Sequence, residues 1–405
     1  MGISEKITGI VSRETLDTAW QNTKCWQGKP LTLTDAQGAY VSPGFINLHI
    51  HGCAGADTMD AEKDTLSVMS RFLVQTGVTS FLPTTMTCDV SSTCKALECI
   101  RKNMIHIIRR RDEKHEPLLS DNNPVNETLA PDYCLLPGAK VLGAYLEGPF
   151  ISSVYKGAQK EEFIIPADFS HIREFADVIK VVVLAPETLR QAPERMQAFI
   201  GQCKEHNIII SLGHSAAEYN EALQAIGAGA SHITHLCNAM TGLHHREPGL
   251  VGAALDKDVT CELIADNLHV HPAVQRLVYR TKSAEEIELI TDSMRACGLP
   301  DGISELGGQT VYVQNGAVRL VDGTLAGSVV TLNRAMDNFR KNTGATVPEV
   351  VRMVTENQAQ ELGLFEKIGS LSPGAAADVT LFDEKFRILR TFVDGREVYK
   401  NPDLR

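Results

Sequence analysis

Residues 207–240 read NIIISLGHSAAEYNEALQAIGAGASHITHLCNAM, a stretch with the form of a strand–helix–strand unit. Two short β-rich runs, 207–215 and 229–240, flank residues 218–227, where apolar side chains recur at three- and four-residue spacing. That spacing is typical of an amphipathic helix. Strands that alternate with helices are typical of a parallel sheet, because a parallel connection needs a long crossover. The stretch therefore predicts an α/β fold.

The same alternation continues between residue 45 and about residue 365. The β-rich runs predict eight strands, at residues 45–52, 77–85, 141–150, 177–187, 207–215, 229–240, 259–269 and 287–294. Eight buried strands with crossover helices indicate a TIM (β/α)8 barrel. A doubly wound open sheet is the alternative, but no G-x-G-x-x-G or P-loop lysine motif follows the first run.

The two ends of the chain have a different pattern. They predict a small β-sandwich-like domain built from residues 1–44 and 366–405, with the barrel domain spanning residues 45–365. The C-terminal segment contains two strand patterns, the second of which turns at Asp394–Gly395. Strands from both termini are therefore expected to pair with one another.

Two further segments are expected to interrupt the barrel. Asn315-Gly316 lies between alternating runs at residues 309–330, which is a strong signal for a β-hairpin after the eighth strand. The polar, proline-rich residues 109–138 predict a long insertion between the second and third strands.

The composition excludes several classes of protein. With 405 residues, 43% of them hydrophobic and 22% charged, the chain is neither disordered nor a small disulfide-stapled scaffold. Its 39 Lys and Arg against 50 Asp and Glu give a net charge of -11, so we expect no nucleic-acid partner. The ten cysteines form no C-x-x-C pair, and most are expected to be buried thiols in a reducing compartment. The N-terminus lacks a signal-peptide pattern, and no apolar run is long enough for a membrane span, so a cytoplasmic protein without a membrane partner is expected.

Polar residues gather at the predicted strand ends, where a TIM barrel builds its active site. These residues are His49, His51, Glu147, His214, His235, Asp266, His269 and Asp292. Because strand side chains alternate between faces, His49 and His51 point the same way, as two ligands of one metal must. Nitrogen and oxygen ligands without thiolate suit zinc, iron or manganese. The pattern predicts a metal site at the mouth of the barrel.

Residues that follow the sixth strand are candidates for contacts with a ligand. Asn238 and Ala239 come directly after His235, where exposed backbone amides could bind it. The stretch HHREPG at residues 244–249 provides Arg246, whose forked guanidinium suits a phosphate group. The sequence is equally consistent with a solvent-exposed Arg246 on a loop.

A series of motifs resembles one known family. In order along residues 42–385 they are PGFINLHIHG, LEGPF, LGHS, THLCNAM, REPGLVGAAL, ADNLHVHP, LITDSM, DGTLAGS and GSLSPGAAADVTLFD. They are similar to those of the N-acetylglucosamine-6-phosphate deacetylases of the amidohydrolase superfamily, and the pairing of THLCNAM with REPGL is specific to these deacetylases. The resemblance implies a homodimeric, metal-bearing TIM-barrel hydrolase with a small β domain. The implied reaction converts N-acetyl-D-glucosamine 6-phosphate to D-glucosamine 6-phosphate and acetate in amino-sugar catabolism.

The resemblance also implies roles for individual residues. Glu147, His214 and His235 match the metal site common to the family, while His49 and His51 match the pair found in members that bind a second ion. Two divalent ions per chain are therefore expected. Asp292 matches the catalytic aspartate and is also expected among the metal ligands. The positions that match substrate-contacting residues are Asn238, Ala239, Arg246, His269 and the loop residues Leu325, Ala326 and Gly327.

One departure from the family concerns Gln159, which we expect among the substrate-binding residues. It stands where single-metal members have a histidine thought to polarise the acetyl carbonyl, and a second metal ion could supply that polarisation here.

Three alternatives to this reaction stay open. N-acetylgalactosamine 6-phosphate differs from the glucosamine substrate only at C4. A cyclic-amide hydrolase is less favoured, because binuclear members of that group often use a carboxylated lysine at the end of strand four. Here that strand ends LAPE, and Lys180 lies at its start. A barrel without enzymatic activity would be expected to have lost ligands, and this chain has the full set.

Overall fold

A ring of parallel strands occupies the centre of the molecule in the computed structural model, which describes residues 2–3, 5–10, 25–26, 29–30, 34–36, 38–112 and 138–403. Within these ranges, eight strands follow one another around the ring in chain order. They are β6 (Phe45–Ile50), β9 (Val78–Thr85), β11 (Ala144–Leu146), β12 (Ile179–Leu184), β13 (Ile209–Leu212), β14 (His232–Ile233), β15 (Thr260–Ile264) and β16 (Ile287–Ile290). All eight predicted strands are present.

The first and last strands of the ring meet and close it. Ile50 at the end of β6 forms a parallel bridge with Ser293, just beyond β16. The backbone N–H of Asp292 donates to the carbonyl of His49 at 2.9 Å. A doubly wound sheet would leave its outer strands apart, so the prediction of a TIM barrel is confirmed and the open-sheet alternative is wrong.

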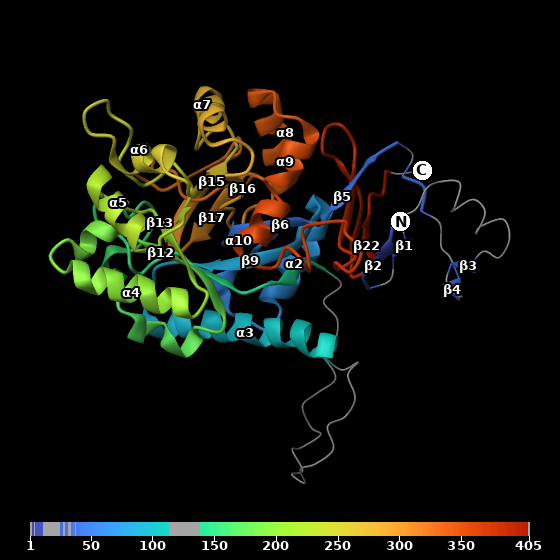
Figure 1. Ribbon diagram of the computed structural model, residues 1–405, viewed down its shortest axis with the longest axis horizontal. Helices are drawn as coiled ribbons and strands as arrows, with labels where there is room; N and C mark the ends of the chain where they lie inside the picture. Colours follow the sequence, from blue (N-terminus) through green and yellow to red (C-terminus); the bar gives the residue numbers. More distant parts are fainter. Residues whose placement is uncertain are drawn as a thin grey trace, which may run out of the picture.

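Helices surround the barrel (Figure 1). They are α2 (Thr65–Leu73), α3 (Val90–Asp112), α4 (Pro193–Glu205), α5 (Tyr219–Ala228), α6 (Gly249–Asp256), α7 (Pro272–Lys282), α8 (Leu332–Thr343), α9 (Val347–Arg352) and α10 (Glu356–Glu361). The helix predicted at residues 218–227 is α5, which begins with a capping box of Glu218 and Glu221 and ends before Gly229. None of the described helices has both the length and the apolar composition that a membrane span requires.

The alternation of side chains along each strand divides the core into two parts. In β12, Val182 and Leu184 belong to the large cluster that includes Phe199 of α4. Val181 and Val183 belong to a smaller cluster that includes Leu48 and other inward-facing side chains. The strands are therefore buried on both faces, which explains why their sequences read as nearly continuous apolar runs.

A four-stranded antiparallel sheet joins the two ends of the chain at one side of the barrel (Figure 1). Its order is β22 (Arg396–Lys400), β21 (Ile388–Val393), β20 (Val379–Phe382) and β5 (Tyr40–Pro43). Asp394 and Gly395 form the predicted turn, with φ of 46° and 77°. Pairing between the two termini is thus confirmed for β5, while the domain boundaries and the sandwich-like arrangement stay predictions.

The predicted hairpin after the barrel is part of a three-stranded sheet. Strands β18 (Gln309–Gln314) and β19 (Ala317–Arg319) pair around Asn315 and Gly316, whose φ values are both positive as this tight turn requires. The preceding strand β17 (Gly302–Leu306) pairs with β18, which extends the hairpin beyond its predicted start.

Helix α3 continues to Asp112, past the predicted start of the insertion at residue 109. The rest of that insertion, residues 113–137, lies outside the described residues. The remaining short strands are β1 (Gly2–Ile3), β2 (Ile7–Gly9), β3 (Cys25–Trp26), β4 (Lys29–Pro30), β7 (Gly52–Cys53), β8 (Ala56–Asp57) and β10 (Lys140–Val141).

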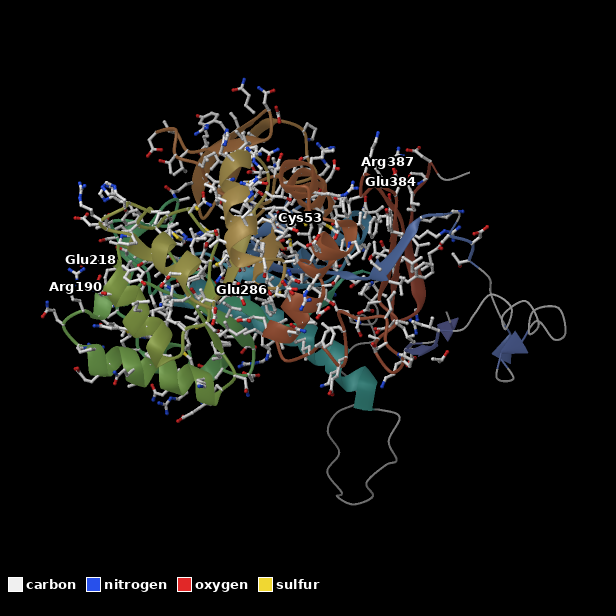
Figure 2. The ribbon with its side chains drawn as sticks, turned by 45° about the horizontal axis from the view of Figure 1, so that its top comes forward. Cys53, Arg190, Glu218, Glu286, Glu384 and Arg387 are labelled. Carbon is white, nitrogen blue, oxygen red and sulfur yellow. The ribbon has the colours of Figure 1, made fainter. Side chains whose placement is uncertain are left out.

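The cysteines are more exposed than the sequence suggested. Among those whose side chains are described, Cys53, Cys203, Cys261 and Cys297 are buried, whereas Cys88, Cys94, Cys99 and Cys237 are half-buried. Figure 2 shows Cys53 within the molecule and charged side chains such as Arg190, Glu218 and Arg387 toward its outside.

Candidate active site

A pocket of about 330 Å³ opens where the barrel strands end. Glu147 comes directly after β11, and Asp292 lies two residues beyond β16, so the pocket is at the C-terminal ends of the strands. The predicted site residues that line it are His51, Glu147, Gln159, His214, His235, Asn238, Ala239, His269, Asp292, Leu325 and Gly327. Strand ends far apart in sequence therefore meet in one cavity, as predicted.

Four predicted residues do not line this pocket, and one of them, Asp266, contacts the lining residue His269. His49 is fully buried just below it, yet its Nε2 lies 3.4 Å from Oε1 of Glu147. Ala326 is buried among apolar side chains beneath the loop. Arg246 is exposed, and its guanidinium contacts Nε2 of the neighbouring His245 at 2.6 Å. The structure brings His49 to the site but does not bring Arg246 into the pocket.

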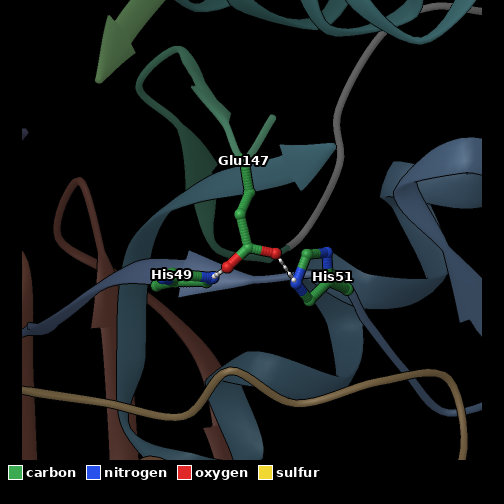
Figure 3. A group of neighbouring side chains, drawn as sticks. All are labelled: His49, His51 and Glu147. Carbon is green, nitrogen blue, oxygen red and sulfur yellow. Dashed lines mark ion pairs between the residues drawn. The ribbon is translucent and has the colours of Figure 1, made fainter. Parts of the chain in front are cut away.

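The carboxylate of Glu147 lies between His49, in β6, and His51, which follows that strand (Figure 3). Its Oε2 is 3.1 Å from Nε2 of His51, while Oε1 faces His49. Oε1 also lies 3.2 Å from Nε2 of His214 and 3.0 Å from Nε2 of His235. One carboxylate therefore contacts four imidazoles, in two groups that share Glu147 and have the spacing of metal ligands.

The Nδ1 atoms of three histidines contact oxygen atoms of the protein, and these contacts direct the Nε2 atoms toward Glu147. Nδ1 of His49 is 2.9 Å from Oε2 of Glu262, and Nδ1 of His51 is 3.2 Å from the carbonyl of Thr84. Nδ1 of His214 is 2.9 Å from the carbonyl of Tyr155. Histidine ligands of metals usually make such second contacts, because these contacts select the tautomer and orient the ring.

Backbone strain gathers at the same strand ends. His214, His235 and Asp292 have φ of 45°, 28° and 46°, in the left-handed region that residues other than glycine seldom adopt. Residues held in this way cluster at functional sites, where surrounding structure sets their geometry. All three residues line the pocket, so the backbone strain coincides with the candidate site.

The electrostatics of the cluster formed by Glu147, its four histidines and Asp292 favour positive charge at the centre of the cluster. Burial alone would lower the pKa of His51, but contacts with Asp292 and Glu147 outweigh it and raise that pKa to about 10. Burial alone would raise the pKa of Glu147, yet the charges of His49 and His214 hold it well below its usual range. A divalent cation supplies the same positive charge without protons.

Asp292 and Gln159 both contact the cluster of Glu147 and its histidines. Oδ1 of Asp292 lies 3.2 Å from Nε2 of His51. The amide of Gln159 donates to Oε2 of Glu147 at 2.7 Å, and its oxygen accepts from the backbone N–H of Thr87 at 2.7 Å. The Gln159 side chain is thus already fixed by the protein at the wall of the pocket.

His269, which lines the pocket, forms a carboxylate–imidazole pair with Asp266. Oδ2 of Asp266 lies 2.6 Å from Nδ1 of His269, and Oδ1 of Asp266 accepts from the backbone N–H groups of Leu268 and His269. Burial would lower the pKa of His269, but the hydrogen bond with Asp266 outweighs it and raises that pKa. Asp266 therefore keeps the His269 ring oriented and favours its protonated form.

Sequence reasoning missed Glu262 and several pocket residues. Met86, Tyr155 and Thr324 line the pocket but have no chemically distinctive pattern in the sequence. Glu262 had a usable signal, since it is a glutamate in the middle of the otherwise apolar run CELI, where a charge needs a buried partner. Its histidine partner could not be read from that signal.

Comparisons with known proteins agree with this geometry. Residues 40–398 match the amidohydrolase family. The N-acetylglucosamine-6-phosphate deacetylase of Bacillus subtilis (strain 168) is 39% identical over 358 residues, covering 87% of this chain and 83% of that protein. The N-acetylgalactosamine-6-phosphate deacetylase of Escherichia coli O157:H7 is 36% identical over 373 residues, covering 91% of this chain and 90% of that protein.

A solved structure extends the agreement to the fold. The N-acetylglucosamine-6-phosphate deacetylase of Pasteurella multocida superposes with a TM-score of 0.81 at 30% identity, covering 99% of this chain and 94% of that chain. The resemblance that the motifs indicated is confirmed over both the barrel and the sheet of the chain ends. The chain belongs to the amidohydrolase family.

Proposed function

We propose that this protein hydrolyses the acetamide of N-acetyl-D-glucosamine 6-phosphate, giving D-glucosamine 6-phosphate and acetate. The observation that carries the proposal is the arrangement of Glu147 among four imidazoles, with Asp292 beside them in one pocket. Amide hydrolysis by a metal-dependent enzyme needs ligands, a proton carrier and a cavity for the substrate. The relatives that match most of the chain have the same type of activity in their names.

The residues present fit two divalent ions, which we propose to be zinc, iron or manganese. One group consists of His49, His51 and Glu147, and the other of Glu147, His214 and His235. All ligand atoms are nitrogen or oxygen, a set that suits these metals. Nε2 of His49 is buried and has no hydrogen-bond partner among the described residues, as expected of a ligand atom. A bound ion of this kind lowers the pKa of its water to about 7 and polarises a carbonyl oxygen.

Asp292 is the proposed proton carrier. In the reaction a water oxygen forms a bond with the acetyl carbon, the bond between that carbon and the sugar nitrogen breaks, and the nitrogen gains a proton. The Asp292 carboxylate accepts the proton from the attacking water and delivers it to the departing nitrogen. One carboxylate can do both if it lies within hydrogen-bond reach of both atoms, and Asp292 lines the pocket beside the metal ligands.

The rest of the pocket is proposed to hold the sugar. Asn238, Ala239 and His269, which line the pocket, are proposed to contact the sugar, and the loop of Leu325, Ala326 and Gly327 is proposed to cover the acetyl group. Gln159, held by Glu147 and Thr87, limits the space next to the metal ligands. Contacts to the remote phosphate place the acetamide at the reacting groups, so binding energy away from the bond contributes to the rate.

N-acetylgalactosamine 6-phosphate is the second candidate substrate, because the relative that acts on it is 36% identical over 91% of this chain. A cyclic-amide substrate is less favoured. Lys180 lies near the start of β12, and its Nζ donates to the carbonyl of Asp177, away from the strand end where a metal-bridging lysine would be needed.

The test compares kcat/KM for the two phosphosugars and for unphosphorylated N-acetylglucosamine, measured by release of acetate. We expect the highest value for N-acetylglucosamine 6-phosphate. Metal analysis of the same sample should give close to two ions per chain. A higher value for the galactosamine compound would transfer the assignment to it, and no acetate from any of the three would contradict the proposed reaction.

We also propose that the protein acts as a cytoplasmic homodimer. Exposed apolar side chains, including Leu243, Leu268, Ile303 and Val321, provide surface that a second copy could cover. Sedimentation analysis at several concentrations tests this, and a monomer at all of them would contradict it.

Replacement of Arg246 tests the proposed phosphate contact. Arg246→Ala should raise KM for the phosphorylated sugar roughly 10- to 100-fold, because hydrogen bonds to charged groups contribute about 1.5–3 kcal/mol. KM for unphosphorylated N-acetylglucosamine should not change. Arg387→Ala, exposed in the turn between β20 and β21 (Figure 2), is the matched control. Equal increases in KM for both sugars would remove Arg246 from the phosphate site.

The Asp266–His269 pair predicts how binding depends on pH. The raised pKa of His269 keeps its ring protonated until the pH passes above the ordinary histidine value near 6.5. In Asp266→Asn the opposing effect of burial remains, so His269 should lose its proton at a lower pH. Because loss of this proton is expected to weaken substrate binding, KM of the variant should begin to rise at a lower pH than KM of the wild type when the pH increases from about 5 to 8. Asp258→Asn, an exposed change, is the control, and identical KM profiles would contradict the proposed role of the pair.

A further inference from the structure

Glu262 is a buried carboxylate inside the barrel that the proposed reaction does not use. It lies in the middle of β15, between Cys261 and Leu263, whose side chains pack in the outer cluster toward the helices. Because side chains alternate along a strand, Glu262 faces the barrel interior, and it has no exposed surface. A charge in such a place is costly unless several partners compensate it.

The partners of Glu262 belong to the metal site. Its Oε2 lies 2.9 Å from Nδ1 of His49 and accepts from the backbone N–H of His235 at 3.0 Å. The same oxygen accepts from the hydroxyl of Thr234 at 3.0 Å. One carboxylate oxygen therefore ties β15 to a histidine of each proposed metal group.

The contact with His49 selects which ring nitrogen is free. A carboxylate accepts, so Nδ1 of His49 must donate its proton to Glu262, which leaves Nε2 as the unprotonated, ligating atom. Nε2 lies 3.4 Å from Oε1 of Glu147 and 3.6 Å from Oδ1 of Asp292. The ring of Tyr145 also packs against the His49 imidazole, with 4.5 Å between the two ring centroids.

His49 and His51 differ in the partner of Nδ1. Nδ1 of His51 meets a neutral backbone carbonyl, that of Thr84, at 3.2 Å, whereas Nδ1 of His49 meets a charged carboxylate at a shorter distance. Hydrogen bonds to ionised groups are stronger than those between neutral groups. Nδ1 of His49 thus depends mainly on the charged Glu262, with Oγ1 of Thr234 as a longer contact at 3.4 Å, whereas Nδ1 of His51 meets a neutral carbonyl.

We propose that Glu262 is a positioning residue that determines whether the metal position at His49 and His51 is filled. It holds His49 in the tautomer and orientation that present Nε2 to an ion, and its negative charge makes that nitrogen a better ligand. The inference rests on the proposed binuclear metal site and adds a supporting residue to it.

The test is Glu262→Gln, because the amide oxygen of glutamine can still accept from His49, Thr234 and His235 while the charge is removed. The protein is stripped with a chelator and titrated with Zn²⁺ by calorimetry, and with Co²⁺ followed by its visible absorption. We expect the variant to bind one of its two ions about 10- to 100-fold more weakly than the wild type, as is typical when a residue supporting a metal ligand is changed. The other ion should bind with unchanged affinity.

The barrel offers a matched control in Glu288. This glutamate of β16 is equally buried and lies 3.1 Å from Nε2 of a histidine, His232, which is not among the proposed ligands. Glu288→Gln should bind both ions as the wild type does. A double variant, Glu262→Gln with His49→Ala, should bind metal no more weakly than His49→Ala alone, since the contact being tested is already absent.

Several outcomes would overturn the proposal. Wild-type affinity for both ions in Glu262→Gln would remove the positioning role, and equal weakening in Glu288→Gln would assign the effect to general damage of the barrel. A wild-type protein that binds a single ion would overturn this inference and the binuclear site together. Acetate release from N-acetylglucosamine 6-phosphate is measured separately, so failure of the proposed reaction is distinguishable from failure of the role of Glu262.

Discussion

Asp292→Asn is expected to fold and bind metal as the wild type does while kcat falls about 100- to 10,000-fold, the usual contribution of a general acid–base group. Asparagine is nearly the same shape but cannot take up the proton from water and pass it to the sugar nitrogen. The backbone should tolerate the change, because asparagine adopts the left-handed conformation that Asp292 has, with φ of 46°. The measurements are kcat and KM for the phosphosugar, with metal content and circular dichroism on the same preparation.

The backbone contacts of Asp292 give a reason to expect an intact structure. Its N–H donates to the carbonyl of His49 at 2.9 Å, and its carbonyl accepts from the N–H of Ser328 at 2.8 Å. Neither contact involves the carboxylate. Asp258→Asn, on the surface, serves as the control. Near-normal turnover would remove Asp292 from the mechanism, and a loss of metal in parallel with activity would make it a ligand and not a proton carrier.

Glu147→Gln is expected to lose most of its bound metal and, with it, the activity. The two carboxylate oxygens of Glu147 reach the Nε2 atoms of all four histidines, and Glu147 belongs to both proposed groups. The glutamine amide has no negative charge and offers one oxygen fewer as a metal ligand. Loss of a residue that only supports a ligand weakens metal binding about 10- to 100-fold, and loss of this central ligand should exceed that.

The measurement is the number of ions per chain after dialysis against a weak chelator, together with acetate release. Glu162→Gln is the matched control, because this glutamate is exposed on a short helix close to Gln159 in the sequence. If Glu147→Gln retained two ions with wild-type affinity, Glu147 would not be the shared ligand, and the two groups would have to be assigned differently.

Much of the fold and of the candidate site could be predicted because both follow from local patterns. A strand buried on both faces reads as a short apolar run, and its crossover helix shows a period of three to four residues. Repeated along the chain, these patterns indicate a parallel barrel. A residue at the end of a barrel strand then has an approximate position in space. For this reason His214 and His235, on successive strands, could be assigned to one site before their 3.1 Å contact was known.

The residues that were missed or misplaced depend on long-range geometry. The contact between Glu262 and His49 joins positions 213 residues apart, and it requires the register of β15 against its neighbours and the rotamers of both side chains. Arg246 lies on an irregular loop, where no repeating pattern indicates which way a side chain points, and the structure leaves it exposed. Gln159 is fixed by the N–H of Thr87, from another loop.

The amino-acid sequence by itself determined the barrel, the pairing of the two chain ends and the set of chemical groups at the mouth. These depend on periodicity, turn residues and strand-end positions, which are local properties. Only the tertiary structure decided how the groups are connected: that Glu147 is shared by two pairs of histidines, and that Glu262 supports His49 and Asp266 supports His269. Such contacts depend on distances of a few tenths of an ångström between distant segments, and these are set by the packing of the whole barrel.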